Sequence, residues 1–203
     1  MANQTIKIHV LHTGLVKVDK ALPFHGQFRN PLAVTGLFRS EVNQITLPVS
    51  SYLIEHPKGL ILIDTGWNKL VRTSNWKELG MQVQINKGYL PAGWAVDERL
   101  AALGYKTSDI DYVLMSHLHC DHASGLPLVK DAKKILVSSR EWRVAIRYRW
   151  FICHVNGKAL TWIPMSMTMS TLGRLTKQWM FLVTVVSCRS PHRVTLPACH
   201  QRW

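Results

Sequence analysis

The stretch that most constrains this chain is residues 116–125, Ser-His-Leu-His-Cys-Asp-His-Ala-Ser-Gly, where three histidines and a carboxylate fall within six residues. Neutral imidazole and carboxylate are ligands that a borderline metal such as zinc takes at physiological pH. If the chain runs extended here, His117, His119 and Asp121 project to one side, and a turn brings His122 round to them. The spacing therefore predicts that this segment supplies ligands to one metal ion or to two adjacent ions.

Two apolar segments predict strands that end at this site. Asp111–Met115 leads directly into the histidines, and α/β proteins place their sites at the carboxyl ends of strands. Leu60–Ile63 ends in Asp64-Thr65-Gly66, which puts a further carboxylate at a strand's carboxyl end. Spacing alone does not separate an ordinary strand-ending turn from a functional corner at Asp64.

The His-x-His-x-Asp-His motif over residues 117–122 resembles that of the metallo-β-lactamase superfamily, whose motif supplies ligands to a one- or two-metal hydrolase centre. The N-terminal two thirds of the chain is most similar to the N-acyl homoserine lactonase-like branch. The resemblance implies an α/β fold, the αββα sandwich in which two sheets pack face to face with helices outside. Only the N-terminal part of that sandwich is expected in this chain.

The resemblance also implies roles for individual residues. His117 and His119 would bind a first zinc ion, and Asp121 and His122 a second. Asp121 would be the catalytic residue that orients the nucleophile or shuttles a proton. Asp64 would stand behind the ligands and orient one histidine, as metal-bound imidazoles usually require. The implied reaction is hydrolysis in which a metal-bound hydroxide attacks the carbonyl of a lactone.

Other segments predict the scaffold of this site. Residues 45–55 and 60–63 read as the two strands of a hairpin joined at Pro57-Lys58-Gly59. A helix is expected after Pro91, with Val96, Leu100 and Leu103 on one face. Residues 134–137 read as a further strand, and Ser138 with Glu141 forms a capping box that opens the next helix.

Length and composition predict one soluble domain. The 203 residues, 47% of them hydrophobic, are enough for one core. The start, residues 1–8, has no basic-then-apolar signal region, and no apolar run approaches a membrane span, so we expect a cytoplasmic protein without a membrane partner. Four cysteines without paired spacing predict no disulfide framework, and Cys120 is expected to face away from the ligands.

Most of the net charge of +13 comes from the last part of the chain. Residues 1–141 hold 16 basic and 12 acidic residues, whereas residues 142–203 hold 9 basic residues and no acidic one. Folded domains rarely run this far without a carboxylate. We therefore expect a metallo-β-lactamase-like domain over residues 1–149 and a tail over residues 150–203 that forms no independent domain.

The tail also lacks the ligands that the resemblance leads one to expect, namely a Pro-Gly-His element, a bridging Asp and a final His. His154, His192 and His200 lie in no such element. A shifted reading frame joins the third base of each codon to the first two bases of the next codon. In that frame Trp179-Met180 gives Asp, and residues 192–198 permit Pro-Gly-His-Ser-Pro-Gly. The hypothesis is a frameshift near residues 147–155, which the coding DNA decides. The zinc ligand set would then be incomplete and the activity impaired.

Two alternative functions stay open from the sequence. Another branch of the same fold, such as a glyoxalase II-like thioesterase, would use the same ligands on a different ester. A nucleic-acid-binding protein would use the basic tail, but arginines spread without a recognisable binding motif argue against that partner. A small-molecule ester or lactone is the expected partner, and the oligomeric state stays undetermined.

Overall fold

The middle of the first strand shows the two-residue alternation of a sheet with one buried face. The computed structural model describes residues 5–24, 31–34, 38–147, 160–163 and 180–185. Along the first strand, Leu11 is 4% exposed and its neighbour Val10 is 57% exposed. The strands are β1 (Lys7–Asp19), β2 (Gln44–His56), β3 (Gly59–Ile63), β4 (Asn86–Tyr89), β5 (Tyr112–Met115), β6 (Ile135–Ser138), β7 (Leu160–Ile163) and β8 (Met180–Val185).

Short helices connect the strands. None of the described helices is long and apolar enough to cross a membrane. The α-helices are α1 (Asn75–Leu79), α2 (Val96–Ala102), α3 (Cys120–Ala123) and α4 (Ser139–Arg147). The 3-10 helices are η1 (Pro31–Val34), η2 (Glu41–Asn43), η3 (Lys69–Arg72), η4 (Gly80–Gln84), η5 (Thr107–Asp109) and η6 (Leu126–Val129).

Helix ends follow the predicted signals with one exception. The N–H of Glu141 donates to the Ser138 hydroxyl at 3.2 Å, so Ser138 caps α4, which begins at the next residue. In α2, Leu100 is fully buried, whereas Leu103 is 39% exposed. The prediction that Leu103 shares the buried face was wrong because α2 ends at Ala102 and the chain turns away at Gly104, which has a φ of 85°.

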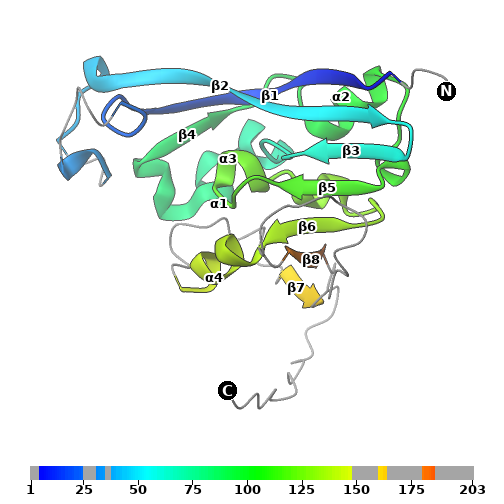
Figure 1. Cartoon of the computed structure of the whole chain (residues 1–203). Coiled ribbons are helices and arrows are strands. Elements are labelled where there is room, and N and C mark those ends of the chain that lie inside the picture. Colours follow the sequence, from blue (N-terminus) through cyan, green and yellow to red (C-terminus); the bar gives the residue numbers. More distant parts are fainter. Residues whose placement is uncertain (1–4, 25–30, 35–37, 148–159, 164–179, 186–203) are drawn as a thin grey trace, which may run out of the picture.

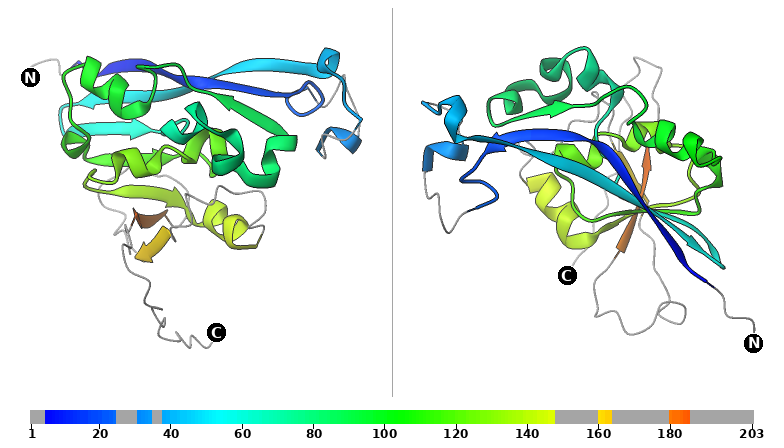
Figure 2. Two further views of the ribbon diagram at one scale, coloured as in Figure 1. Left: turned by 180° about the vertical axis from the view of Figure 1, so that it is seen from behind. Right: turned by 90° about the horizontal axis from the view of Figure 1, so that it is seen from above.

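One mixed sheet holds the strands in the order β4-β1-β2-β3-β5-β6-β8-β7 (Figure 1). The predicted hairpin is confirmed, because β2 and β3 pair antiparallel with Glu55 opposite Leu60. Strands β3, β5 and β6 are parallel, and Ile63 lies opposite Leu114. Figure 2 shows that β1 and β2 form a long curved ribbon. The end of this ribbon that carries η1 and η2 lies far from α2. Parallel pairing of β3 with β5 brings the two predicted strand ends to the same edge.

The core lies on the side of the sheet that carries α2 and α3. Inward residues of β1, β2, β3, β5 and β6 pack there against α2, α3 and η6 in one buried cluster. A second cluster surrounds Trp67, which is fully buried and whose indole N–H donates to the Leu15 carbonyl at 3.0 Å. The segment over residues 116–125 contributes Leu118 and Ala123 to the first cluster and Cys120 to the second. Helices packed on a mixed sheet confirm the predicted α/β class.

The opposite face of β1 and β2 is apolar and open. Ile8 is 64% exposed and Tyr52 is 39% exposed. The register places Val10 opposite Tyr52 and Ile8 opposite Ile54, so these side chains share one patch. An apolar sheet face of this kind favours self-association.

Part of the predicted tail joins the sheet. β8 pairs antiparallel with β6, and β7 pairs antiparallel with β8. The boundary predicted between residues 149 and 150 lies outside the described residues, and the division into domain and tail stays a prediction. The frameshift hypothesis likewise stays a prediction.

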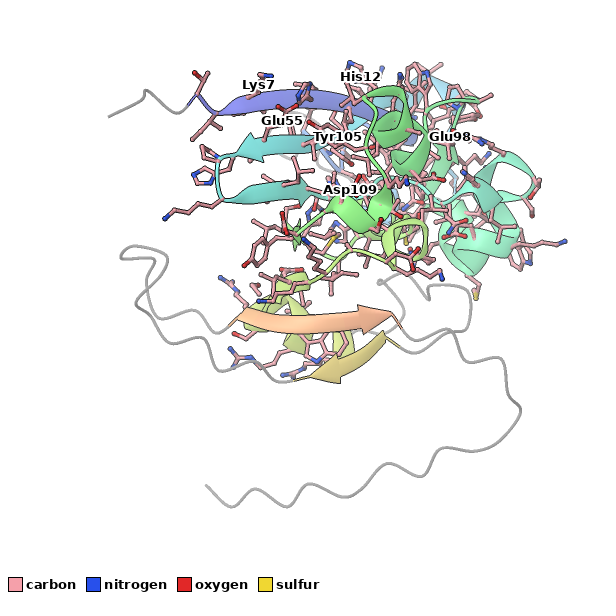
Figure 3. All side chains as sticks on the ribbon, turned by 90° about the vertical axis from the view of Figure 1, so that its right-hand side faces the viewer. Lys7, His12, Glu55, Glu98, Tyr105 and Asp109 are labelled. Carbon is pink, nitrogen blue, oxygen red and sulfur yellow. The ribbon has the colours of Figure 1, made fainter. Side chains whose placement is uncertain are left out.

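Ion pairs tie the elements around the core. Lys7 on β1 lies beside Glu55 on β2, 3.4 Å apart (Figure 3). Glu98 on α2, also labelled in Figure 3, accepts two hydrogen bonds from the Arg72 guanidinium, at 2.9 and 2.6 Å. Hydrogen bonding to Arg72 lowers the pKa of Glu98 to about 2, against the opposing effect of burial and with help from the Ala95 N–H.

This shift predicts a pH dependence of stability. Because the folded pKa of Glu98 lies below its usual 4.5, its contribution is present above pH 4.5 and is lost as the pH falls towards 2. Wild type should therefore exceed E98Q in thermal stability near neutral pH, and the difference should close in that window. Thermal unfolding of both proteins across this pH range measures it. A difference that is equal at every pH would contradict the assignment.

Candidate metal centre

The predicted ligand segment follows β5 and enters α3. Leu118 and Cys120 are 2% and 3% exposed, while His117 is half-buried and His119 is exposed, so the predicted alternation holds through Cys120. It was wrong at Asp121, which lies in α3 and not in an extended segment. The helix begins at Cys120, and the His119 carbonyl accepts the N–H groups of His122 and Ala123, at 3.0 and 2.9 Å. This single turn carries Asp121 and His122 back towards His117.

The corner at Asp64-Thr65-Gly66 is bonded directly to this segment. The N–H and hydroxyl of Thr65 both donate to the His122 carbonyl, at 2.9 and 2.8 Å. The Gly125 N–H donates to the Gly66 carbonyl at 2.9 Å. Gly66 has a φ of 64°, and a Cβ there would lie 2.3 Å from the Thr13 side chain. The corner and the ligand segment therefore form one rigid unit across the β3 and β5 strand ends.

Asp64 is the buried centre of this unit, with 5% exposure and a φ of 58°. Its Oδ1 accepts from the Ser116 N–H at 2.8 Å. Its Oδ2 accepts from the Ser116 hydroxyl at 2.6 Å and lies 2.8 Å from His122 Nδ1. Both carboxylate oxygens are thus engaged with residues of the ligand segment.

The structure brings all four predicted ligands together. The His117 ring lies between two others, with centroids 4.7 Å from His119 and 4.1 Å from His122. Asp121 Oδ2 lies 3.4 Å from His122 Nε2. Three imidazoles and a carboxylate therefore share one small region, and this donor set suits zinc.

Among the described residues, Asp64, His117 and His122 form a group that could hold a metal ion, with ligand atoms within 4.8 Å of one another. It includes Asp64 and leaves out His119 and Asp121. Because the oxygens of Asp64 already accept hydrogen bonds from Ser116 and His122, Asp64 is better suited to orient a ligand than to bind an ion. The contacts of Asp64 agree with an orienting role, and this role and the ligand roles of the other four residues stay predictions.

The pKa values of His117 and His122 are shifted in opposite directions. Burial lowers the pKa of His117, and the nearby His122 and His119 lower it further. Burial also opposes protonation of His122, but the hydrogen bond to Asp64 and the charge of Asp121 outweigh it and raise the pKa of His122. Burial of Asp64 is likewise outweighed, because hydrogen bonds from His122 and Ser116 hold the pKa of this carboxyl below its usual value. Both pKa shifts favour the charged forms of Asp64 and His122.

Cys120 takes no part in this cluster. Its thiol donates to Gln82 Oε1 at 2.9 Å, and its side chain packs in the cluster around Trp67. The prediction that Cys120 faces away from the ligands is confirmed.

Sequence reasoning missed three polar residues that assemble the site: Ser116, Thr65 and Ser124. The buried Ser124 hydroxyl accepts from the Asn68 N–H at 2.9 Å and so fixes the end of the ligand segment. A signal for Ser116 was available. Because β3 and β5 run parallel and end at the same edge, the residue after β5, Ser116, lies beside the residue after β3, Asp64.

Comparison with known proteins bears on the whole site. A family model described as the metallo-beta-lactamase superfamily matches residues 45–153. The N-acyl homoserine lactonase AiiB of Agrobacterium fabrum is 33% identical over 144 residues, which cover 70% of this chain and 50% of that protein. An N-acyl homoserine lactonase of Bacillus cereus is 33% identical over 87 residues, 41% of this chain and 34% of that protein. The chain thus spans about half the length of AiiB.

Solved structures agree on the fold. An N-acyl homoserine lactone hydrolase with its product N-hexanoyl-L-homoserine at the catalytic metal centre matches with a TM-score of 0.56 and 24% identity, over 72% of this chain and 54% of that one. A probable metal-dependent hydrolase from Staphylococcus aureus matches with a TM-score of 0.50 and 28% identity, over 72% of this chain and 52% of that one. With its fold, its His-x-His-x-Asp-His segment and these matches together, the chain belongs to the metallo-β-lactamase superfamily and is similar to its N-acyl homoserine lactonases.

Proposed function

We propose that this chain descends from, and retains the metal-binding half of, a zinc-dependent hydrolase that opens lactones of the N-acyl homoserine lactone type. The observation that carries the proposal is the cluster of three imidazoles and Asp121, held against Asp64 at the ends of β3 and β5. Similarity to lactonases such as AiiB supports the substrate class. A cytoplasmic location is part of the proposal.

The described residues would divide between two ions. His117 and His119 would hold one zinc ion, and Asp121 and His122 the other. Zinc, when bound, supplies the Lewis acidity that activates water near neutral pH and polarises a carbonyl. Asp64 keeps the His122 ring in place through the 2.8 Å contact with Nδ1. The half-buried Asp121, which lies beside His122 Nε2, would orient the attacking water or take its proton.

The ligand count limits this activity. Catalytic zinc sites generally use three protein ligands for each ion, and the four proposed ligands give each ion two. We therefore expect weak zinc binding and slow hydrolysis by this chain.

Calorimetric zinc titration and a lactone-opening assay with N-hexanoyl homoserine lactone test the proposal. Wild type should bind zinc weakly and open the lactone slowly, and the doubly substituted H117A/H119A should do neither. A thioester assayed in parallel separates the lactonase from the thioesterase alternative. Tight binding of two zinc ions with rapid turnover would show that residues elsewhere complete the ligand set. No zinc binding and no hydrolysis would overturn the function.

A further inference from the structure

The hydroxyl of Ser116 joins the two half-buried histidines of the site through one carboxylate oxygen. It donates to Asp64 Oδ2 at 2.6 Å and lies 2.9 Å from His117 Nδ1. The same Asp64 Oδ2 lies 2.8 Å from His122 Nδ1. The contacts form a continuous path from His117 through Ser116 and Asp64 to His122.

The direction of each hydrogen bond follows from the number of protons. A serine hydroxyl has one hydrogen, and in Ser116 it points to Asp64. The hydroxyl oxygen must therefore accept at its contact with His117, so His117 carries a hydrogen on Nδ1. An ionised carboxylate only accepts, so His122 also carries a hydrogen on Nδ1. In a neutral imidazole of this form, the free lone pair lies on Nε2.

We infer that Ser116 is a positioning residue that fixes His117 as the Nδ1–H tautomer and so presents its Nε2 lone pair to a metal ion. Asp64 does the same for His122 without an intermediary. The two histidines differ in this respect, because within the described part of the chain the contact between Asp64 and His117 runs through the Ser116 hydroxyl. In the absence of this hydroxyl, His117 Nδ1 loses its described protein acceptor, and both tautomers become available to the ring.

The side chain of Ser116 suits a test by substitution. Ser116 is exposed, so S116A opens no buried cavity, and its backbone N–H still donates to Asp64 Oδ1. S116T keeps a hydroxyl at the same position. Ser50 provides a matched control, because its hydroxyl lies 3.4 Å from His12 Nδ1 on β1 and β2, in a contact outside the relay.

Histidine 15N NMR of the metal-free, full-length protein near pH 8 measures the tautomers, with signals assigned from H117Q and H122Q. Wild type and S116T should show Nδ1–H at His117 and His122. S116A should shift His117 to a mixture and leave His122 unchanged, and its zinc dissociation constant should rise about tenfold. S50A should match wild type in both measurements.

The inference rests on the proposed metal site, but the two can fail separately. Nε2–H at His117 in wild type, or an unchanged His117 tautomer in S116A, would overturn the role of Ser116 whether or not zinc binds. Wild-type zinc affinity in S116A, where wild type itself binds zinc, would also overturn it. Absence of zinc binding by wild type, with the expected tautomers, would overturn the proposed function and leave the tautomer assignment standing.

Discussion

Replacing Asp64 by asparagine should lower zinc affinity by roughly 10- to 100-fold, the range found when a group that orients a metal-bound histidine is removed. Asp64 Oδ2 accepts from both the Ser116 hydroxyl and His122 Nδ1. An amide has only one oxygen, so D64N either loses one of these contacts or sets its NH₂ group against another donor. If the contact with His122 Nδ1 is lost, the hydrogen of this imidazole can move to Nε2, the nitrogen that a metal ion would bind.

Asparagine is the informative substitution because of the backbone. Asp64 has a φ of 58°, a conformation that asparagine adopts more readily than alanine. D64N should therefore fold, and its affinity can be measured by competition with a chromophoric chelator. D19N is the matched control. Asp19 is the last residue of β1, is 1% exposed and accepts hydrogen bonds from the Arg39 guanidinium. D19N should lose stability and keep zinc affinity, while equal affinities in D64N and wild type would contradict the orienting role.

Replacing Gly125 by alanine should destabilise the fold and the metal site together. A Cβ at Gly125 would lie 2.3 Å from the Thr65 carbonyl oxygen and 3.1 Å from that of Gly66. Both contacts are with backbone, so relief requires the ligand segment to move away from the corner. Overpacking of this kind costs about 1–3 kcal/mol, and at roughly 2–4 °C for each kcal/mol in a chain of this size the midpoint should fall by several degrees.

The cause of the G125A effect can be isolated. Gly125 has a φ of −75°, which alanine adopts freely, so the clash acts alone. At Gly93 the reverse holds, because φ is 78° and nothing lies within 4 Å of an added Cβ. G93A should thus lower the unfolding midpoint through backbone strain and leave zinc affinity unchanged. G125A should lower both, and wild-type zinc affinity in G125A would show that the corner does not position the ligands.

The elements that the sequence predicts correctly are those that depend on neighbouring residues. The hairpin around Pro57-Lys58-Gly59 follows from the turn residues and the apolar strands on each side, and β2 and β3 pair as expected. The N-cap at Ser138 follows from a spacing of three residues to Glu141. These features survive in the structure because tertiary contacts add to local preferences and do not oppose them.

The error at Asp121 comes from a place where a distant contact overrides a local pattern. The alternation through His117 and His119 extends naturally to Asp121, but α3 begins before that residue. The corner at Asp64 holds the His122 carbonyl through Thr65, a bond between residues 57 positions apart. Leu103 is a different case, because it fits the apolar face of α2 by spacing but follows the last residue of the helix, which ends locally at Gly104. No local pattern records the bond between Thr65 and His122.

The sequence alone determined which side chains gather at this site, because His117, His119, Asp121 and His122 lie within six residues directly after a strand. Tertiary structure decided how they are presented. The proton positions on His117 and His122 depend on Asp64, which is 52 residues from Ser116 and 58 from His122. Only the parallel register of β3 and β5 brings these groups within hydrogen-bond distance. The physical reason is that ligand identity is a property of each residue, whereas the direction of a lone pair is set by the partner on the other ring nitrogen.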